Sequence, residues 1–240
     1  MIMGFFAGFI DAIAGGGGLI ILPSLLTAGM PPALALGTNK LIGAMGEFSA
    51  VLQYLRHQRV DYRRMALGFV FVLIGSSLGA ITVQFIHPRY LEKMIPFLLL
   101  IVLAYVLLAQ KPRKQTKPLM NEKVFFTVFG FFIGFYNGFF GPGTGTIWTA
   151  VLMFFISFDI RSAIIYTKPI NLVGNLIALL WFIIGGHVDY SVAIVGGVGT
   201  FIGGRAGARF VMFKEVRLIK WLFVVFVLFM TIGLFIKYYG

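Results

Sequence analysis

The stretch that decides the fold is Gly4-Phe5-Phe6-Ala7-Gly8-Phe9-Ile10-Asp11-Ala12-Ile13-Ala14-Gly15-Gly16-Gly17-Gly18, an apolar segment broken by four consecutive glycines. Its first part returns 126 residues later as Gly130-Phe131-Phe132-Ile133-Gly134-Phe135, followed by a second break at Gly141-Pro142-Gly143. Beyond the breaks the offset becomes 128, so that Val60-Asp61-Tyr62 corresponds to Val188-Asp189-Tyr190. A run of matched residues at one offset indicates an internal duplication.

The composition is that of a membrane protein. Hydrophobic residues make up 59% of the 240 residues and charged residues only 12%, whereas soluble domains carry about a quarter charged residues. The apolar residues form long runs such as Leu91–Leu108, and a helix needs roughly 20 such residues to cross a bilayer. Only helices satisfy their backbone hydrogen bonds within one segment, so we predict an all-α integral membrane protein. The basic residues behind the net charge of +12 lie between the apolar segments, where they set the orientation of the protein in the membrane. They do not indicate nucleic-acid binding.

The duplication divides the chain into repeat one, residues 1–109, a basic linker, residues 110–123, and repeat two, residues 124–240. Together the repeats form one membrane domain. Each has four apolar segments, which span residues 3–28, 33–55, 65–86 and 91–109, then 124–157, 162–184, 190–212 and 217–237. The first, glycine-broken segment of each repeat either crosses the membrane or re-enters as a hairpin.

The positions of lysine and arginine distinguish these two topologies. Lys40 and Lys168 lie inside segments, and the other 18 basic residues divide 10:8 between the two sides if all eight segments cross. If the first segment of each repeat is a hairpin, they divide 15:3, with the linker on the basic, cytoplasmic side. We therefore predict two inverted repeats, each with a glycine-broken re-entrant hairpin plus three transmembrane helices, and both termini outside the cytoplasm.

The glycine breaks are the first candidate site. Irregular backbone at membrane depth is tolerated where it is buried in protein or lines a wet cavity, and free N–H groups at the start of a half-helix favour an anion. The alternative is a tight bend that needs glycine for steric reasons. The residues predicted here to contact substrate are Gly15, Gly16, Gly17, Gly18, Gly141, Gly143 and Thr144.

Two lysines inside apolar segments are the second candidate site. Lys40 and Lys168 occupy equivalent positions, and two ammonium groups in one cavity repel each other unless an anion lies between them. The alternative is that both snorkel to the membrane surface. Lys168 shares a helix face with Asn171 and Asn175, at spacings of three and seven residues. The predicted substrate-binding set is completed by Thr38, Asn39 and Asn137.

Two carboxylates at membrane depth are candidates for proton coupling. Such a buried charge costs roughly 2.5–3.5 kcal/mol, so Asp11 and Glu47 each need a function or a partner, and Lys40 is the partner considered for both. Alternatively, Asp11 caps a half-helix near the water surface. The counterparts Asn137 and Asn175 are neutral, which fits coupling in one repeat and binding in both.

Three motifs carry a resemblance to a known family, namely Gly8–Gly18, Thr38-Asn39-Lys40 and Gly134–Gly143. Over nearly the whole chain the sequence resembles the sulfite exporter TauE/SafE family of bacterial membrane proteins. The resemblance implies a plasma-membrane transporter of small sulfur-containing anions, such as sulfite or organosulfonates. Asn137 departs from the acidic residue expected there in closely similar members, which argues against a proton site at that position.

The sequence as a whole predicts a secondary transporter of a small anion that works by alternating access, and the resemblance implies that it exports sulfite or an organosulfonate. A passive anion channel on the same scaffold is the first alternative. An intramembrane enzyme is the second, but no catalytic dyad supports it. The chain has no cysteine and its histidines lack metal-ligand spacing, so we expect no catalytic residue, cofactor or metal. The expected partners are the anion, the lipid bilayer and, in a homo-oligomer, a second copy. The expected location is the bacterial plasma membrane, crossed several times.

Overall fold

The computed structural model describes residues 1–58, 60–108, 117–213, 228, 232–234 and 236–237. Every regular element in this part of the chain is a helix, which confirms the predicted all-α class. In chain order the helices are α1 (Ile2–Ala14), α2 (Gly18–Thr27), α3 (Pro32–Leu55), α4 (Tyr62–Gln84), α5 (Pro88–Leu108), α6 (Glu122–Phe139), α7 (Thr144–Phe155), α8 (Ile160–Ile184) and α9 (Tyr190–Phe213).

The limits of the long helices follow the predicted segments closely, and side-chain caps explain several of them. The Asp61 carboxylate accepts hydrogen bonds from the N–H groups of Arg63 and Arg64 at the start of α4. Asp159 accepts from Arg161 and Ser162 at the start of α8, and such caps satisfy N–H groups that the helix itself leaves free. The predicted segment 217–237 and linker 110–123 lie largely outside the described residues.

The predicted glycine-broken segments 3–28 and 124–157 each form two helices instead of one, α1 with α2 and α6 with α7. Helix α1 ends at Gly15, whose φ of 73° is left-handed, and α2 begins three residues later. Helix α7 begins after Gly143, whose φ is 82°. A residue with a side chain pays roughly 1–2 kcal/mol in this conformation, so the glycines determine where each segment breaks.

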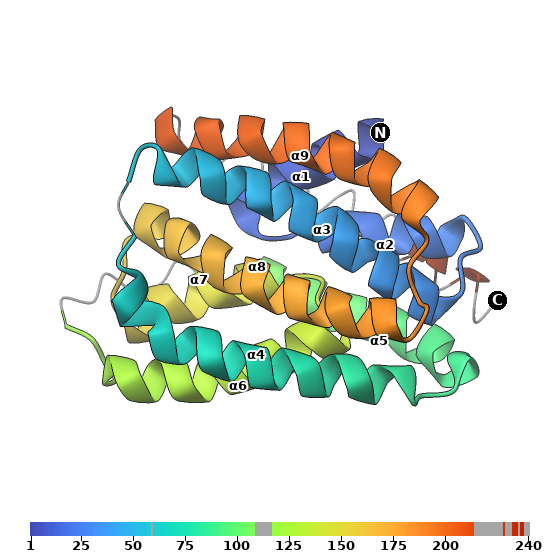
Figure 1. Cartoon of the computed structure of the whole chain (residues 1–240), viewed down its shortest axis with the longest axis horizontal. Coiled ribbons are helices and arrows are strands. Elements are labelled where there is room, and N and C mark those ends of the chain that lie inside the picture. Colours follow the sequence, from blue (N-terminus) through green and yellow to red (C-terminus); the bar gives the residue numbers. More distant parts are fainter. Residues whose placement is uncertain (59, 109–116, 214–227, 229–231, 235, 238–240) are drawn as a thin grey trace.

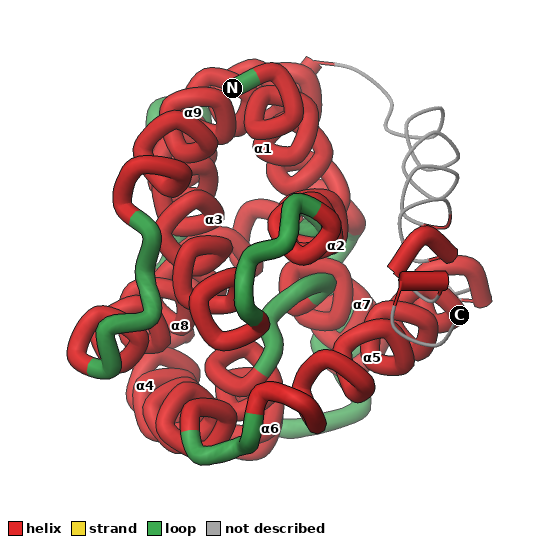
Figure 2. Tube along the Cα trace, turned by 90° about the vertical axis from the view of Figure 1, so that its right-hand side faces the viewer, coloured by secondary structure: helices red, strands yellow, loops and turns green. Residues whose placement is uncertain are grey.

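The helices pack as two outer pairs with α3 and α8 between them. Figures 1 and 2 show α1 lying along α9 on one side and α4 along α6 on the other. Glycines let the two helices of each pair approach closely. A methyl group at Gly79 would lie 2.1 Å from the Phe135 carbonyl oxygen, and one at Gly207 would lie 2.3 Å from that of Phe9.

Two of the described helices, α4 and α8, are long and apolar enough to cross a membrane by length and composition alone. Helix α3 has 24 residues, but it carries Lys40 and Glu47 at buried positions, which lower its mean hydropathy. The half-helices α1, α2 and α7 are apolar but short. The polar residues therefore lie in the interior helices, where α3 meets α8 and the two breaks.

Candidate functional site

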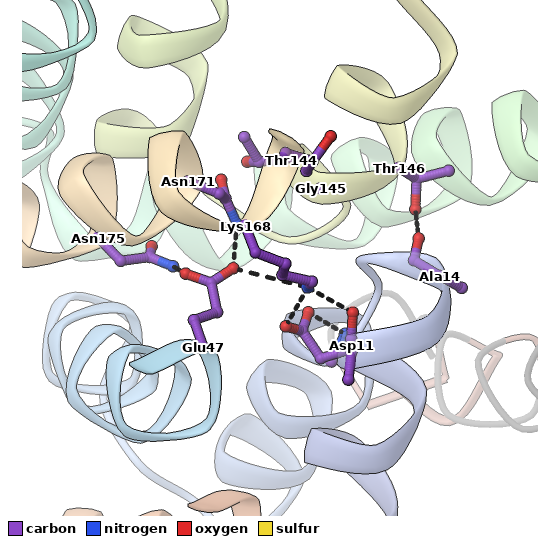
Figure 3. A network of polar contacts seen from close by, with 12 residues as sticks. Asp11, Ala14, Glu47, Thr144, Gly145, Thr146, Lys168, Asn171 and Asn175 are labelled. Atoms are coloured by element: carbon purple, nitrogen blue, oxygen red, sulfur yellow. Dashed lines mark hydrogen bonds and ion pairs between the residues drawn. The ribbon is translucent and has the colours of Figure 1, made fainter. Parts of the chain in front are cut away.

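The two helix breaks contact each other directly. A methyl group at Gly15 would lie 2.3 Å from the Gly145 carbonyl carbon, so the two backbones touch. The Thr146 hydroxyl donates to the Ala14 carbonyl oxygen at 2.6 Å, which ties the second break to the first (Figure 3). Residues from both halves of the chain thus form a single site.

Asp11 organises the break between α1 and α2. Its Oδ1 accepts a hydrogen bond of 3.0 Å from the Gly17 N–H, and its Oδ2 lies 2.7 Å from the Lys168 ammonium nitrogen. Lys168 also donates to the Asp11 carbonyl oxygen and is 1% exposed. Asp11 therefore caps the start of α2, and it holds α8 against the break with an ion pair.

Lys40 makes the equivalent contact with the other break. Its ammonium group donates to the Asn137 carbonyl oxygen, to Asn137 Oδ1 at 2.7 Å and to Asn175 Oδ1 at 3.2 Å. Each lysine therefore contacts the break in the other half of the chain: Lys168 contacts the first break, and Lys40 contacts the second. Lys40 is also 1% exposed, so both lysines point to buried acceptors and neither snorkels to a surface.

Glu47 connects the two lysine contacts. Its carboxylate accepts from Asn171 Nδ2 and, at 2.8 Å, from Asn175 Nδ2, and it lies 4.0 Å from the Lys168 nitrogen (Figure 3). Lys40 was considered as the partner of both carboxylates from spacing along the sequence. That pairing was wrong, because the antiparallel packing of α3 against α8 gives Lys168 to both Asp11 and Glu47.

A small cavity of about 30 Å³ lies beside this network at the junction of the two halves. Many residues predicted from the sequence line it, namely Asp11, Gly15, Gly17, Gly18, Asn39, Glu47, Gly141, Gly143, Asn171 and Asn175. The Asn39 side-chain oxygen is buried and has no hydrogen-bond partner within the described part of the chain. An unpartnered buried amide is costly, so it points to an occupant of the cavity.

Six predicted residues do not line the cavity. Lys40, Lys168 and Asn137 lie behind its wall in the network just described. Thr38 accepts a hydrogen bond from the Asp189 N–H, and Thr144 donates to the Gly141 carbonyl. Gly16 lies in the first break but outside the lining.

Other lining residues escaped the sequence reasoning. Gly43 and Gly46 lie within a turn or so of Glu47 on α3, so helical periodicity could have indicated them. No sequence signal indicated Thr200 of α9. Among the described residues no cluster of three histidine, cysteine, aspartate or glutamate side chains could hold a metal ion.

A helical bundle with two broken helices meeting at a polar cavity is the architecture of a multi-pass membrane transporter. The chain belongs to the family described as Sulfite exporter TauE/SafE, whose model matches residues 1–234. Membership places it among transporters and not among enzymes, as the sequence predicted.

Curated bacterial relatives agree with this assignment. The chain is 40% identical over 233 residues to a "Probable membrane transporter protein" of Haemophilus influenzae, covering 95% of this chain and 90% of that protein. It is 37% identical over 215 residues to "Probable membrane transporter protein YfcA" of Escherichia coli K12, covering 89% and 80%. It is 37% identical over 224 residues to "Probable membrane transporter protein ORF9" of a Sinorhizobium species, covering 92% and 85%. No solved structure matches the chain.

Proposed function

We propose that this protein is a secondary transporter that exports a small anion, sulfite or an organosulfonate, across the bacterial plasma membrane by alternating access. The observation that carries the proposal is the cavity where the two helix breaks meet, lined from both halves of the chain. Substrate sites of secondary transporters commonly lie at such broken helices, on the interface between two repeats.

The packing supports two inverted repeats, residues 1–109 and 124–240, joined by the linker 110–123. Helix α1 of repeat one packs on α9 of repeat two, and α6 of repeat two packs on α4 of repeat one. A pseudo-two-fold axis that relates the two repeats would produce this pairing, because it exchanges α1 with α6 and α4 with α9. The antiparallel contact of the equivalent helices α3 and α8 fits the same axis, because Lys40 meets Asn175 while Glu47 meets Lys168.

The path of the chain supports a re-entrant hairpin at the start of each repeat. In Figure 1, α1 runs inward from the end marked N and α2 runs back towards that same end. Helices α6 and α7 make the matching turn from the opposite end of the molecule. With α3, α4 and α5 as full crossings, repeat one has three. Repeat two has α8 and α9, and the segment 217–237 that the sequence predicts as its third lies largely outside the described residues.

The charges of the site explain why a proton would accompany the anion. Two lysines and two carboxylates lie in or beside the cavity, so the network is formally neutral, and the lining itself contains carboxylates but no lysine. An added anion would leave a net negative charge in a region of low dielectric, which is unfavourable. Protonation of Asp11 or Glu47 removes that charge, so proton and anion binding favour each other. The two then move in the same direction, and export occurs where the outward gradient of the anion exceeds the inward gradient of the proton.

Transport in proteoliposomes tests the proposal. The purified protein is reconstituted and flux is measured for sulfite, sulfate, sulfoacetate, thiosulfate and simple carboxylates, with and without an imposed pH gradient. We expect saturable flux of sulfite or sulfoacetate, and accumulation driven by the gradient. Single-channel currents without saturation would identify a passive channel instead, and absence of flux for every anion tested would refute the proposal.

A further inference from the structure

Building on the proposed anion transport, we infer that the chain of contacts Lys40–Asn175–Glu47 exchanges partners during transport, with Lys40 taking the anion and Glu47 the proton, while Lys168 and Asp11 stay paired. The sequence makes Lys40 and Lys168 equivalent, and it marks both Asp11 and Glu47 as candidates for the proton. Their surroundings do distinguish them.

The Lys168–Asp11 pair is held together by contacts that leave neither partner free for the substrate. Asp11 uses one oxygen for the Gly17 N–H and the other for the Lys168 ammonium group. Both partners are donors only, and neither can accept a hydrogen bond from a protonated carboxyl group. Both carboxylate oxygens of Asp11 are therefore already committed to donors, and Asp11 stays paired with Lys168 in the proposed exchange.

Lys40 has no carboxylate within 4.0 Å among the described residues, unlike Lys168. Within the described residues its acceptors are the backbone and side-chain oxygens of Asn137 and the side-chain oxygen of Asn175, all neutral. Hydrogen bonds from an ammonium group to an anion are about twice as strong as those between neutral groups. An anion in the cavity would therefore replace the longest of these contacts, the 3.2 Å bond to Asn175.

Only a glycine separates Lys40 from the cavity. Gly141 lines the cavity, and a methyl group at that position would lie 2.3 Å from the Lys40 nitrogen. The ammonium group thus touches the wall where the backbone has no side chain. Asn39 lines the same cavity, and because its unpartnered oxygen only accepts hydrogen bonds, it would contact the anion through its NH2 group after the amide turns over.

Glu47 has partners that accommodate either protonation state. Asn171 and Asn175 donate their side-chain amide groups to its carboxylate, and Lys168 is no closer than 4.0 Å. An asparagine amide that turns over presents an oxygen in place of its NH2 group, and so accepts from a protonated carboxyl. Glu47 can therefore gain and lose a proton without leaving a buried group unsatisfied.

Asn175 links the two events. Its oxygen now binds Lys40 and its nitrogen binds Glu47. When an anion takes over Lys40, the Asn175 oxygen is released and can turn to accept the hydrogen of protonated Glu47. One proton then enters with one negative charge, the network keeps its neutrality, and each ligand favours the other by the same factor.

The test compares two isosteric variants, Glu47→Gln and Asp11→Asn, in the same proteoliposomes with sulfite as the probe. We expect both variants to lower sulfite flux per inserted molecule, but to differ in coupling. The remaining flux of Glu47→Gln should no longer depend on a pH gradient, whereas that of Asp11→Asn should still depend on it. The second readout is the infrared difference spectrum on adding sulfite, in which a protonated carboxyl group adds a C=O stretching band.

Loss of that band in Glu47→Gln and its presence in wild type would support the inference. Persistence of the band in Glu47→Gln would overturn it, even if Asp11→Asn does not fold. So would gradient-independent flux in the wild type, or loss of coupling in folded Asp11→Asn alone. A wild-type protein that moves no sulfite at all would instead refute sulfite transport itself, so the two failures are distinguishable.

Discussion

The contact between the two breaks makes Gly15→Ala the sharpest test of the site's architecture. Gly15 has a φ of 73°, and an added methyl group would lie 2.3 Å from the Gly145 carbonyl carbon and 2.5 Å from the Thr146 nitrogen. These are backbone atoms, so no side-chain rotation can relieve the overlap. Alanine at this position must therefore push the two breaks apart.

The expected loss has two parts. The left-handed conformation costs a residue with a side chain about 1–2 kcal/mol, and overpacking of a filled interior typically costs about 1–3 kcal/mol. Together they predict a loss of about 2–5 kcal/mol of stability. Gly186→Ala is the matched control, because Gly186 has a φ of 71° but nothing within 4 Å of the added methyl group. For Gly186→Ala, only the cost of the left-handed conformation applies.

Thermal unfolding of both purified variants in the same detergent gives the comparison, and sulfite flux per inserted molecule gives its functional counterpart. We expect Gly15→Ala to unfold at a clearly lower temperature than Gly186→Ala and to lose transport, while Gly186→Ala transports normally. Equal unfolding temperatures would show that the two breaks do not meet as described, and the site built on their contact would have to be abandoned.

Three further predictions concern topology, the lysines and a helix cap. Reporter fusions in 56–62 and 111–120 should read cytoplasmic and a fusion after Gly240 external; a cytoplasmic carboxyl terminus would exclude the hairpin topology. Lys40→Met should lose anion flux but insert normally. Lys168→Met should also lose flux and, because it leaves Asp11 unpaired, should cost about 3–5 kcal/mol of stability. Normal flux in both variants would show that the lysines do not bind the anion. Asp159→Ala should cost about 1 kcal/mol through loss of the α8 cap and leave flux per inserted molecule unchanged, and an unaltered unfolding temperature would contradict the cap.

Local features of the fold were predictable from the sequence because they depend on neighbouring residues. Apolar runs set the helices, and aspartates such as Asp61 start them. Glycine runs mark the breaks, since few other residues adopt a positive φ. Matched residues at a constant offset identified Lys40 and Lys168 as equivalent before any contact was known.

The partners of those residues were not predictable, because an offset shows equivalence and not proximity. Spacing along α3 suggested Lys40 for Glu47, yet the antiparallel α8 supplies Lys168, Asn171 and Asn175 instead. For the same reason the sequence did not indicate Thr200, which lines the cavity because α9 packs against α3. Contacts between helices are set by packing in three dimensions, and a single sequence records them only indirectly.

The difference in charge between the two halves follows from the anion that the site is proposed to carry. Both carboxylates, Asp11 and Glu47, belong to the first half, and the equivalent positions of the second half hold Asn137 and Asn175. A fully symmetric site with four carboxylates and two lysines would be strongly negative and would repel an anion at close range. Amides at Asn137 and Asn175 keep the hydrogen bonds to Lys40 while removing that charge. The substituted side chains therefore leave Lys40 with neutral acceptors, which is the arrangement that the proposed anion exchange requires.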